Sequence, residues 1–590
     1  MSGTQPATAA LEQAALQQIR NGDLAAATEL YQEAIRQGGA SAAACSNLAA
    51  LKLKAGRVGE AVELLKQALQ LAPHNAEAWL NLGTAQHALQ QLEPAVESFR
   101  RAATLRPGLT KAHANLGHAY LAADQPQNAL ESYGLALQQQ PLYPEVLSGR
   151  GVALRQLGRL NESIDSLQQA LLQRAQAPDL LNNLGLSLQA AGRREEALNC
   201  FEQALALSPD QAELHSNLGL LWMEQGRIQQ AAGCFRRALQ LNPLYPEAHW
   251  HLAYCVDGRV EHEPEQQALA SLEALADHPK RYHLQFTIAK YKLDRQDPEA
   301  AAWFCEANRI RCEQLAGRWV LPQANDLLNL NRSVLERGNE HSDPGHHDVD
   351  SAPTAPTLVF IVGLPRSGST LVETILSQNN NLLDLGEVNH LHRALQHSHS
   401  LAAIRTHYLK SAYSHPSYTP AIQAISDKFL YNFAYCQILA TAFPSCRILH
   451  VYRNPMDNIW STFTNHFTSS NEWSYNLEQS VAFYHLYREV MAAHEQAMPG
   501  RIQHINYDRL TRAPEREVPA LIAACGFPWH DAYLHPEQSQ RVIHTASVVQ
   551  ARAPISSRSV GRWLHYRELL EPYAEQLEEL GYSTAIEPVA

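Results

Sequence analysis

The chain has 590 residues, a length at which two or more independently packed domains are expected. It carries 47 Lys and Arg against 59 Asp and Glu, and the resulting net charge of −12 disfavours general affinity for nucleic acid or anionic membrane. Any anion site must therefore be local. The nine cysteines form no CxxC pair, no apolar run is long enough to span a membrane, and the N-terminus lacks a signal-like pattern. These features predict a cytoplasmic protein with no membrane span.

A period of 34 residues runs through the first part of the chain. A glycine recurs once in most 34-residue units. Alanine recurs at two further positions of the period, and proline recurs near the end of most units. Small residues are expected where two helices approach closely, and proline ends a helix because it removes a donor. Each unit therefore predicts helix, turn and helix. The glycines that mark the period are Gly83, Gly117, Gly151, Gly185 and Gly219.

One unit resembles the tetratricopeptide-repeat consensus closely: Trp79 to Gly83, then Ala95, Phe99 and Pro107. About seven copies fit between residues 8 and 245, and diverged capping repeats extend the expected array to 8–311. The resemblance implies an α superhelical array, folding independently over residues 1–337, that holds a peptide or protein partner on its concave side. A role as spacer or oligomerisation surface is the alternative.

A polar segment rich in Pro, Asp and His predicts a linker at residues 338–356. Its three histidines, His341, His346 and His347, could ligate a metal only with a rigid second shell, which such a segment does not supply. We therefore predict no metal site.

The segment that follows predicts an anion-binding turn between a strand and a helix. Residues 357–362 are apolar and β-branched, as in a strand buried on both faces of a parallel sheet, and residues 371–376 read as helical. Between them lies Gly363-Leu-Pro-Arg-Ser-Gly-Ser-Thr370, whose order matches a phosphate cradle at a helix start. Ser369 stands where a nucleoside-triphosphatase loop has lysine, which disfavours a kinase.

This turn contains Pro365-Arg-Ser-Gly-Ser-Thr370, and it resembles the first motif of sulfotransferases that use 3′-phosphoadenosine 5′-phosphosulfate (PAPS). A second strand over 447–452 leads to Arg453 and Ser461, which resemble the family's pair for the 3′-phosphate. The guanidinium group of an arginine and a hydroxyl group can together donate several hydrogen bonds to a phosphate that carries two negative charges. The resemblance implies an α/β, P-loop-like domain with a central parallel sheet over 357–590.

Within the family, protein-tyrosine sulfotransferases are the most similar, and their motifs imply roles for further residues. Glu387, which lies 21 residues after Arg366, matches their base, and Lys428 matches their catalytic lysine. Arg366 joins these two as the third implied catalytic residue. One departure is Asn465, which stands where those enzymes carry an additional cofactor arginine. The implied PAPS contacts are Arg366, Ser367, Gly368, Ser369, Thr370, Arg453, Ser461, Tyr507, Ser547 and Arg562.

The sequence therefore predicts a sulfotransferase that moves a sulfuryl group from PAPS to an acceptor hydroxyl, without a metal. The acceptor is either a peptide tyrosine or a saccharide, and these alternatives stay open. The competing hypothesis is a tetratricopeptide scaffold whose C-terminal domain is a catalytically silent nucleotide-binding remnant.

Overall fold

A computed structural model describes residues 4–37, 41–315, 317, 319–340, 356–415, 417–467, 471–539 and 553–586, without the side chains of 4–7 and 338–340. The chain divides into two compact units, residues 1–217 and 218–590, and each is considered by itself. The division falls among the repeats, not at the linker expected at 338–356. Residues 341–355 of that linker lie outside the described residues.

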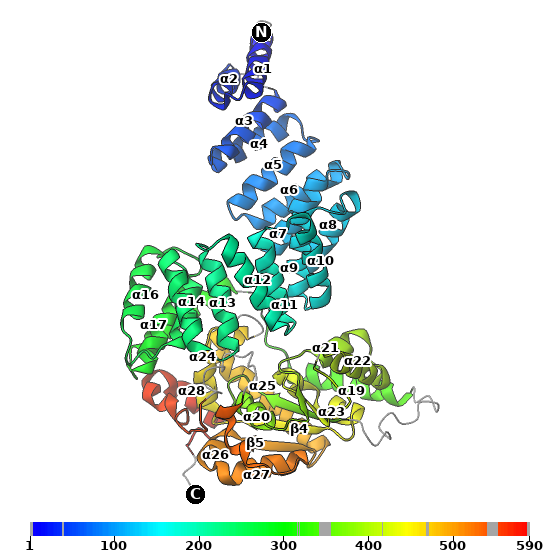
Figure 1. Cartoon of the computed structure of the whole chain (residues 1–590), viewed down its shortest axis with the longest axis vertical. Helices are drawn as coiled ribbons and strands as arrows, with labels where there is room; N and C mark the ends of the chain where they lie inside the picture. The colour runs from blue at the N-terminus through cyan, green and yellow to red at the C-terminus, as the bar shows by residue number, and fades with distance from the viewer. Residues whose placement is uncertain are drawn as a thin grey trace. The chain divides into compact units, whose positions relative to one another are not determined.

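The first eighteen described helices form successive pairs joined by short turns (Figure 1). The fold class expected for this part, a tetratricopeptide array of helical hairpins, is confirmed. The helices that belong wholly to the first unit are α1 (Thr4–Arg20), α2 (Leu24–Arg36), α3 (Ala42–Lys54), α4 (Val58–Leu71), α5 (Ala76–Ala88), α6 (Leu92–Leu105), α7 (Thr110–Ala122), α8 (Pro126–Gln139), α9 (Pro144–Gln156), α10 (Leu160–Gln173), α11 (Pro178–Ala190) and α12 (Arg194–Leu207). The later ones are α13 (Ala212–Glu224), α14 (Ile228–Leu241), α15 (Pro246–Cys255), α16 (Glu263–Ala274), α17 (Arg281–Asp294) and α18 (Ala300–Gln314).

The periodic glycines lie where the two helices of a hairpin touch. A Cβ atom added to Gly185 on α11 would lie 2.7 Å from the ring of Phe201 on α12, and one added to Gly117 would lie 2.4 Å from the ring of Tyr133. Both rings are fully buried. Each hairpin therefore closes on itself by fitting a bulky side chain of its second helix against a glycine of its first.

The last two hairpins, α15 to α18, lack this glycine and use their apolar residues differently. Trp250 on α15, Phe286 on α17 and Phe304 on α18 belong to one continuous core with residues of the α/β domain. Among them, the ring of Phe304 lies 5.9 Å from that of Trp460, at 83°. The end of the array thus shares its core with the domain that follows.

The α/β domain is built on a five-stranded sheet in the order β2-β3-β1-β4-β5, with every neighbouring pair parallel. Its remaining helices precede, link and follow the strands. The strands are β1 (Thr357–Gly363), β2 (Leu382–Asp384), β3 (Ala424–Asp427), β4 (Arg447–Tyr452) and β5 (Ile502–Asn506). The helices are α19 (Ala324–Glu340), α20 (Ser369–Leu376), α21 (His390–His397), α22 (Leu401–Tyr413), η1 (Leu430–Tyr435), α23 (Cys436–Ala442), α24 (Pro455–Phe463), η2 (Glu472–Tyr475), α25 (Leu477–Ala497), α26 (Tyr507–Arg512), α27 (Pro514–Cys525), η3 (Asp531–Leu534), η4 (Pro536–Gln538), η6 (Arg562–Tyr566) and α28 (Arg567–Glu579).

Helices cover both faces of the sheet, as its uninterrupted apolar strands require. Alternate residues of β1 enter two separate cores: Phe360 packs with the core that contains α19, α23 and α25, whereas Ile361 packs with α20 and α27. Figure 1 shows α26 and α27 on one side of the sheet and α19, α23 and α25 on the other. The expected α/β domain with a central parallel sheet is confirmed.

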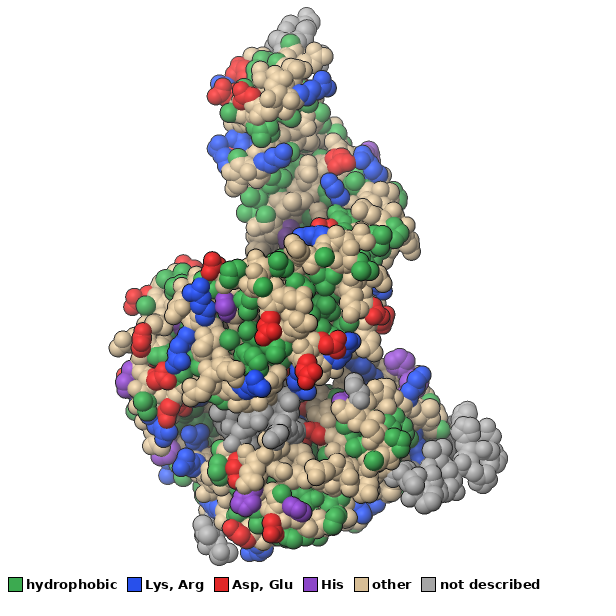
Figure 2. Space-filling view, viewed as in Figure 1, with side chains coloured by type: hydrophobic (Ala, Val, Ile, Leu, Met, Phe, Trp, Pro, Cys, Tyr) green, Lys and Arg blue, Asp and Glu red, His purple; other side chains and the backbone are tan. Residues whose placement is uncertain are grey.

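The surface shows the mixed charge that the composition implies. Acidic and basic side chains are interspersed on the face seen in Figure 2. Of the helices that the structure describes, none combines the length and the apolar character needed to cross a membrane.

Candidate active site

The candidate site lies along the carboxyl edge of the sheet. Strand β1 leads into the loop that holds Arg366, β2 is followed closely by Glu387, and β3 directly by Lys428. Likewise β4 is followed by Arg453 and β5 by Tyr507. Because all five strands run in parallel, these residues share one edge, where open α/β sheets bind their ligands.

The backbone of the turn after β1 requires glycine at two positions. Gly363 has φ 149° and a Cβ there would lie 2.3 Å from the carbonyl oxygen of Val451; Gly368 has φ 99° and a Cβ there would lie 2.0 Å from the ring of Tyr507. Arg366 also has a positive φ, 64°. A non-glycine residue in this conformation stores backbone strain of the kind that clusters at binding sites.

Hydroxyl groups line this turn and the start of α20. Ser367, Ser369 and Thr370 are all buried, and the Ser367 hydroxyl has no hydrogen-bond partner among the described residues. The first amides of a helix have no partner within the helix and carry partial positive charge. A buried hydroxyl in need of a partner beside a helix start fits a phosphate group of a nucleotide donor.

Lys428 connects the turn to the expected base. Its Nζ lies 3.0 Å from Glu387 Oε1, 3.0 Å from Glu373 Oε2 and 3.4 Å from Thr370 Oγ1. Lys428 and Glu373 are fully buried, whereas 47% of the Glu387 side chain is exposed. The lysine is therefore fixed by two carboxylates, of which only Glu387 can meet an acceptor arriving from solvent.

Glu373 was not among the site residues predicted from the sequence. The residue lies on α20 one turn after the loop that follows β1, and its side chain pairs with Lys428, which is 55 positions away. Its signal was a lone carboxylate in the apolar run of that helix, since a fully buried charge needs a partner.

Another buried carboxylate directly precedes Lys428. Burial raises the pKa of Asp427 to about 7, opposed by hydrogen bonds from the Phe429 amide at 2.9 Å and the Tyr408 hydroxyl at 2.8 Å. The nearby Glu373 raises the pKa of Asp427 further. The end of β3 thus holds a carboxyl group that titrates near neutral pH.

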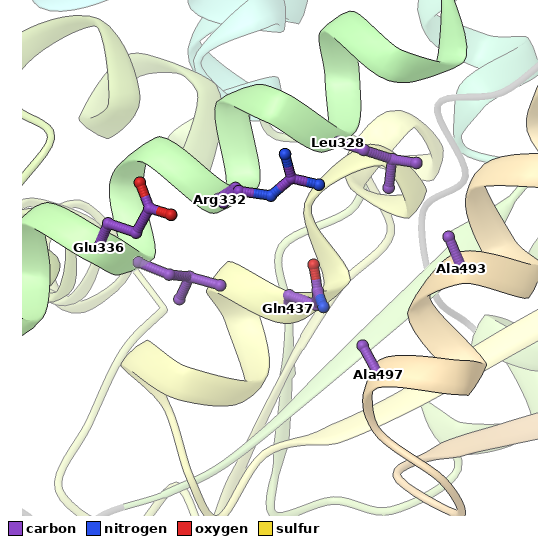
Figure 3. A pocket seen from close by; sticks show the side chains of 7 residues that line it. Leu328, Arg332, Glu336, Gln437, Ala493 and Ala497 are labelled. Carbon is purple, nitrogen blue, oxygen red and sulfur yellow. The ribbon is translucent and has the colours of Figure 1, made fainter.

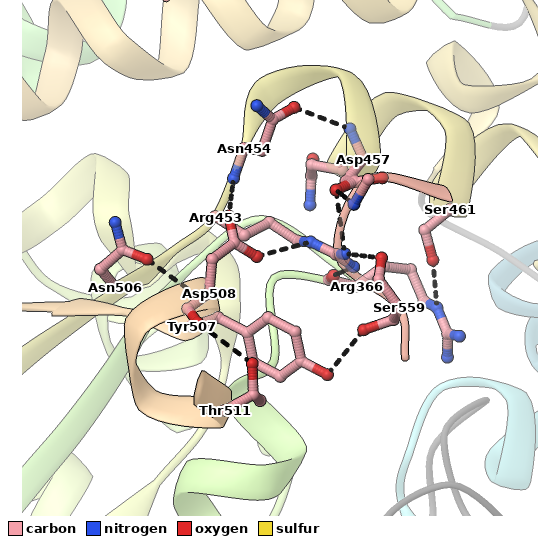
Figure 4. Close-up of polar contacts among 12 residues, drawn as sticks. Arg366, Arg453, Asn454, Asp457, Ser461, Asn506, Tyr507, Asp508, Thr511 and Ser559 are labelled. Carbon is pink, nitrogen blue, oxygen red and sulfur yellow. Dashed lines mark hydrogen bonds and ion pairs between the residues drawn. The ribbon is translucent and has the colours of Figure 1, made fainter. Parts of the chain in front are cut away.

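A second cluster surrounds Arg366 and Arg453 (Figure 4). Arg366 Nε donates to Ser461 Oγ at 3.1 Å, and Arg453 donates to the carbonyl oxygens of Ser559 at 2.7 Å and Arg366 at 3.4 Å. Burial lowers the pKa of Arg366, and the charge of Arg453 lowers it further. Two guanidinium groups in low-dielectric surroundings favour a bound anion.

Carboxylates balance part of this charge. Arg453, with 5% of its side chain exposed, lies 3.7 Å from Asp457 and 3.9 Å from Asp508, and its guanidinium carbon is 5.0 Å from the Tyr507 ring centroid. A phosphate at this place would therefore meet an arginine whose position is already fixed from several sides.

The C-terminal segment closes over this second cluster. The Asp457 carboxylate accepts from the amides of Gly561 at 2.5 Å and Trp563 at 3.2 Å, and Tyr507 and Ser559 share a hydroxyl hydrogen bond of 3.0 Å. These contacts anchor η6, on which Arg562 is exposed. The expected contact Ser547 lies outside the described residues.

A pocket elsewhere in the α/β domain is separate from this site. A pocket shared by α19, α23 and α25 has Leu328, Arg332, Glu336, Gln437 and Ala493 in its lining, and none of the candidate site residues belongs to it (Figure 3). No cluster of three potential metal-ligating side chains occurs within the described ranges.

Comparisons with known proteins agree with the two parts of the fold. A profile described as "Sulfotransferase family" matches residues 387–531, and profiles described as "Tetratricopeptide repeat" match 52–116, 142–210, 182–246 and 223–263. The chain joins tetratricopeptide repeats to a sulfotransferase-family domain. The sulfotransferase match includes Glu387, Lys428, Arg453, Ser461 and Tyr507, whereas the loop at 365–370 and Arg562 lie outside it.

Individual relatives cover less of the protein. An uncharacterized protein of Aquifex aeolicus is 29% identical over 247 residues, which are 38% of this chain and 32% of that protein, so the match spans about a third of the relative. A tetratricopeptide repeat protein from Parabacteroides merdae is similar over 42% of this chain and 97% of its own, with 18% identity and a TM-score of 0.36. A thermophilic repeat protein of Thermus thermophilus is similar over 31% of this chain and 100% of its own, with 24% identity and a TM-score of 0.27.

Proposed function

We propose that this sulfotransferase-family domain uses PAPS as its donor and transfers the sulfuryl group to an acceptor hydroxyl, with Glu387 as the base. The observation that carries the proposal is the contact chain from Thr370 in the anion-binding turn through Lys428 to Glu387. It links a place suited to the 5′ phosphosulfate to a carboxylate that solvent reaches.

The two clusters suit the two ends of the donor. Ser367, Gly368, Ser369 and Thr370 would hold the 5′ group at the start of α20, where backbone amides and hydroxyls gather. Arg453 and Ser461 would hold the 3′-phosphate, with Arg366 between the two clusters. Tyr507, Arg562 and Ser547 complete the expected set of donor contacts.

PAPS supplies a sulfuryl group that is already activated by its bond to phosphate, so no metal is needed. The acceptor oxygen forms a bond to sulfur as the bond from sulfur to the bridging oxygen breaks, and the electron pair stays on that oxygen. Glu387 takes the acceptor proton. Lys428 stabilises the charge of the leaving oxygen by turning toward it the N–H that now contacts Thr370 Oγ1 at 3.4 Å.

The acceptor is a peptide tyrosine or a saccharide hydroxyl. The resemblance to tyrosine enzymes supports a peptide tyrosine as the acceptor, and so does the ability of tetratricopeptide arrays to bind peptides. In that case residues of the array select the peptide. The test is transfer of radiolabelled sulfate from PAPS into a lysate of the source cells, followed by separation of labelled peptide, glycan and small-molecule products.

The competing function is a scaffold with a silent nucleotide-binding domain, and Glu387→Gln separates the two. This variant keeps the size of the side chain but removes the base, so turnover should fall by about 10²-fold or more with donor affinity nearly unchanged. Glu515→Gln, which alters an exposed carboxylate on α27, is the matched control. Normal turnover in Glu387→Gln would show that the proton goes elsewhere, and absence of transfer by the unaltered protein would favour the scaffold.

A further inference from the structure

The hydrogen bonds at the end of α24 bear on the candidate site, because this helix carries Ser461. The last carbonyl groups of a helix have no partner within it and must find one elsewhere. The carbonyl of Trp460 accepts from the Thr464 amide at 3.0 Å, and that of Thr462 accepts from the Asn465 amide at 3.1 Å. The Asn465 side chain donates to the carbonyl of Ser461 at 2.6 Å.

The remaining carbonyl is satisfied from the repeat array. Asn308 on α18 is 1% exposed, and its Nδ2 donates to the carbonyl of Phe463 at 2.9 Å. The array also holds the residue whose side chain caps the Ser461 carbonyl: the Tyr254 hydroxyl on α15 donates to Asn465 Oδ1 at 3.3 Å. The array therefore helps to complete the last turn of α24, directly through Asn308 and indirectly through Tyr254.

Tyr254 is held firmly for this contact. Its ring lies 4.7 Å from that of Trp250, at 85°, and 5.5 Å from Lys290 Nζ, which pairs with Asp294 at 2.7 Å. Burial raises the pKa of Tyr254, and the positive charge of Arg366 opposes the rise. The phenol therefore lies close enough to Arg366 for the two side chains to interact electrostatically.

A chain of contacts therefore leads from the array to the expected 3′-phosphate subsite: Tyr254 to Asn465, Asn465 to the Ser461 carbonyl, and the Ser461 hydroxyl to Arg366. Asn465 is 5% exposed and has no charge of its own. Its two amide ends are both used, one toward the helix and one toward the array, so its orientation depends on Tyr254.

We infer that Tyr254, a residue of the repeat array, is a positioning residue of the donor site. By holding Asn465, it fixes the turn of α24 that presents Ser461, so the array tunes recognition of the 3′-phosphate. This inference rests on the proposed function, because it assigns a role within the site proposed for PAPS.

The test uses the full-length protein and two ligands that differ only in the group concerned. Tyr254→Phe removes the hydroxyl and keeps the ring. It should weaken adenosine 3′,5′-bisphosphate by roughly threefold to tenfold in calorimetry, the usual effect of one hydrogen bond, while affinity for AMP stays unchanged. A purely structural role would lower both affinities together or neither.

A matched control is available on α17. Tyr291 is fully buried, and its hydroxyl has no hydrogen-bond partner among the described residues, so Tyr291→Phe should leave both affinities unchanged. Asn465→Ala should weaken the bisphosphate at least as much as Tyr254→Phe, and the double variant should add little to it, because the two side chains act through one contact.

Two results would overturn the inference while leaving the proposed function standing: unchanged bisphosphate affinity in Tyr254→Phe, or equal losses for bisphosphate and AMP. Additive losses in the double variant would also contradict it, because Tyr254 would then act without Asn465. If the unaltered protein showed no preference for the bisphosphate over AMP, the proposed function would fail, and this inference with it.

Discussion

The hairpins of the first unit and the last two hairpins of the array are built from similar helices but bury their bulky residues in different places. In the first unit, Phe201 and Tyr133 close their own hairpins against Gly185 and Gly117. In the last two, Phe286 and Phe304 belong to the core of the α/β domain. Loss of the glycine period therefore marks where the array begins to share its core with the α/β domain.

The largest expected effect comes from cutting the chain at the two possible boundaries. A fragment of residues 210–590 keeps the shared core and should fold and bind adenosine 3′,5′-bisphosphate, whereas a fragment of 338–590 exposes that core and should be insoluble or unfolded. Circular dichroism, thermal unfolding and calorimetry measure this. A well-folded 338–590 fragment would show that the α/β domain does not depend on the core that it shares with the last two hairpins.

The complementary N-terminal fragments test the same boundary. A fragment of residues 1–209 should be strongly helical on its own, because each repeat contacts mainly its neighbours. A fragment of 1–337 should associate or aggregate, since it leaves the apolar residues of α15, α17 and α18 uncovered. If 1–337 proved monomeric and stable, the independent array expected from the sequence would be correct. A higher acceptor KM for 210–590 than for the full chain would show that residues 1–209 select the acceptor.

The junction, where the ring of His466 in the α/β domain packs against Tyr282 and Phe286 of the array, should also be acid-sensitive. Burial, together with the nearby His283 and Arg311, lowers the pKa of His466 to about 2, and burial lowers the pKa of His283 well below its ordinary value. Groups with a lowered pKa are neutral in the folded state and take up protons on unfolding, so stability is full above pH ~6.5 and falls as the pH drops. Between pH 7.5 and 5 each such histidine should remove about 2 kcal/mol of unfolding free energy from fragment 210–590.

Urea unfolding of both fragments across this pH range measures the difference. His466→Phe should reduce the pH dependence of fragment 210–590, because the ring that must stay neutral is gone. In fragment 1–209 we expect a smaller change. Equal acid sensitivity in the two fragments would contradict a role of the junction histidines.

The smallest effect is expected inside the first unit. Gly185→Ala places a methyl group 2.7 Å from the Phe201 ring, and overpacking of this kind costs about 1 to 3 kcal/mol. The variant should lower the melting temperature of fragment 1–209 but leave bisphosphate binding by the full chain unchanged. Gly134→Ala on α8 is a suitable control, since an added Cβ there meets no atom within 4 Å. An unchanged melting temperature would show that the close fit at Gly185 is not needed.

Much of the fold could be predicted because its signals are local. The 34-residue period locates the hairpins, and the apolar run of β1 followed by Gly363 and Gly368 predicts the strand, turn and helix. The family motifs also led to residues that the structure places at the carboxyl edge of one sheet, although their roles stay predictions. Ser547 remains untested because it lies outside the described residues.

The features that could not be predicted from the sequence are those that depend on contacts between residues far apart in the chain. Glu373 gains its meaning only from Lys428, and Asn308 on α18 pairs with a carbonyl 155 positions away. In the sequence, Tyr254 is only an aromatic residue in a repeat that departs from the 34-residue pattern. Its role could not be predicted, because its contact with Asn465 spans 211 positions. Neither period nor motif spacing reports such pairs.

The shared core limits the places at which this protein can be recombined with others, in the laboratory or during evolution. A natural splice point would be the polar segment at 341–355, yet a graft made there would separate Asn308 and Tyr254 from the helix whose end they complete. Exchange of whole repeats upstream of α13 leaves these contacts intact. New arrays are therefore expected to be gained or lost among the early hairpins, while α15 to α18 are inherited with the catalytic domain.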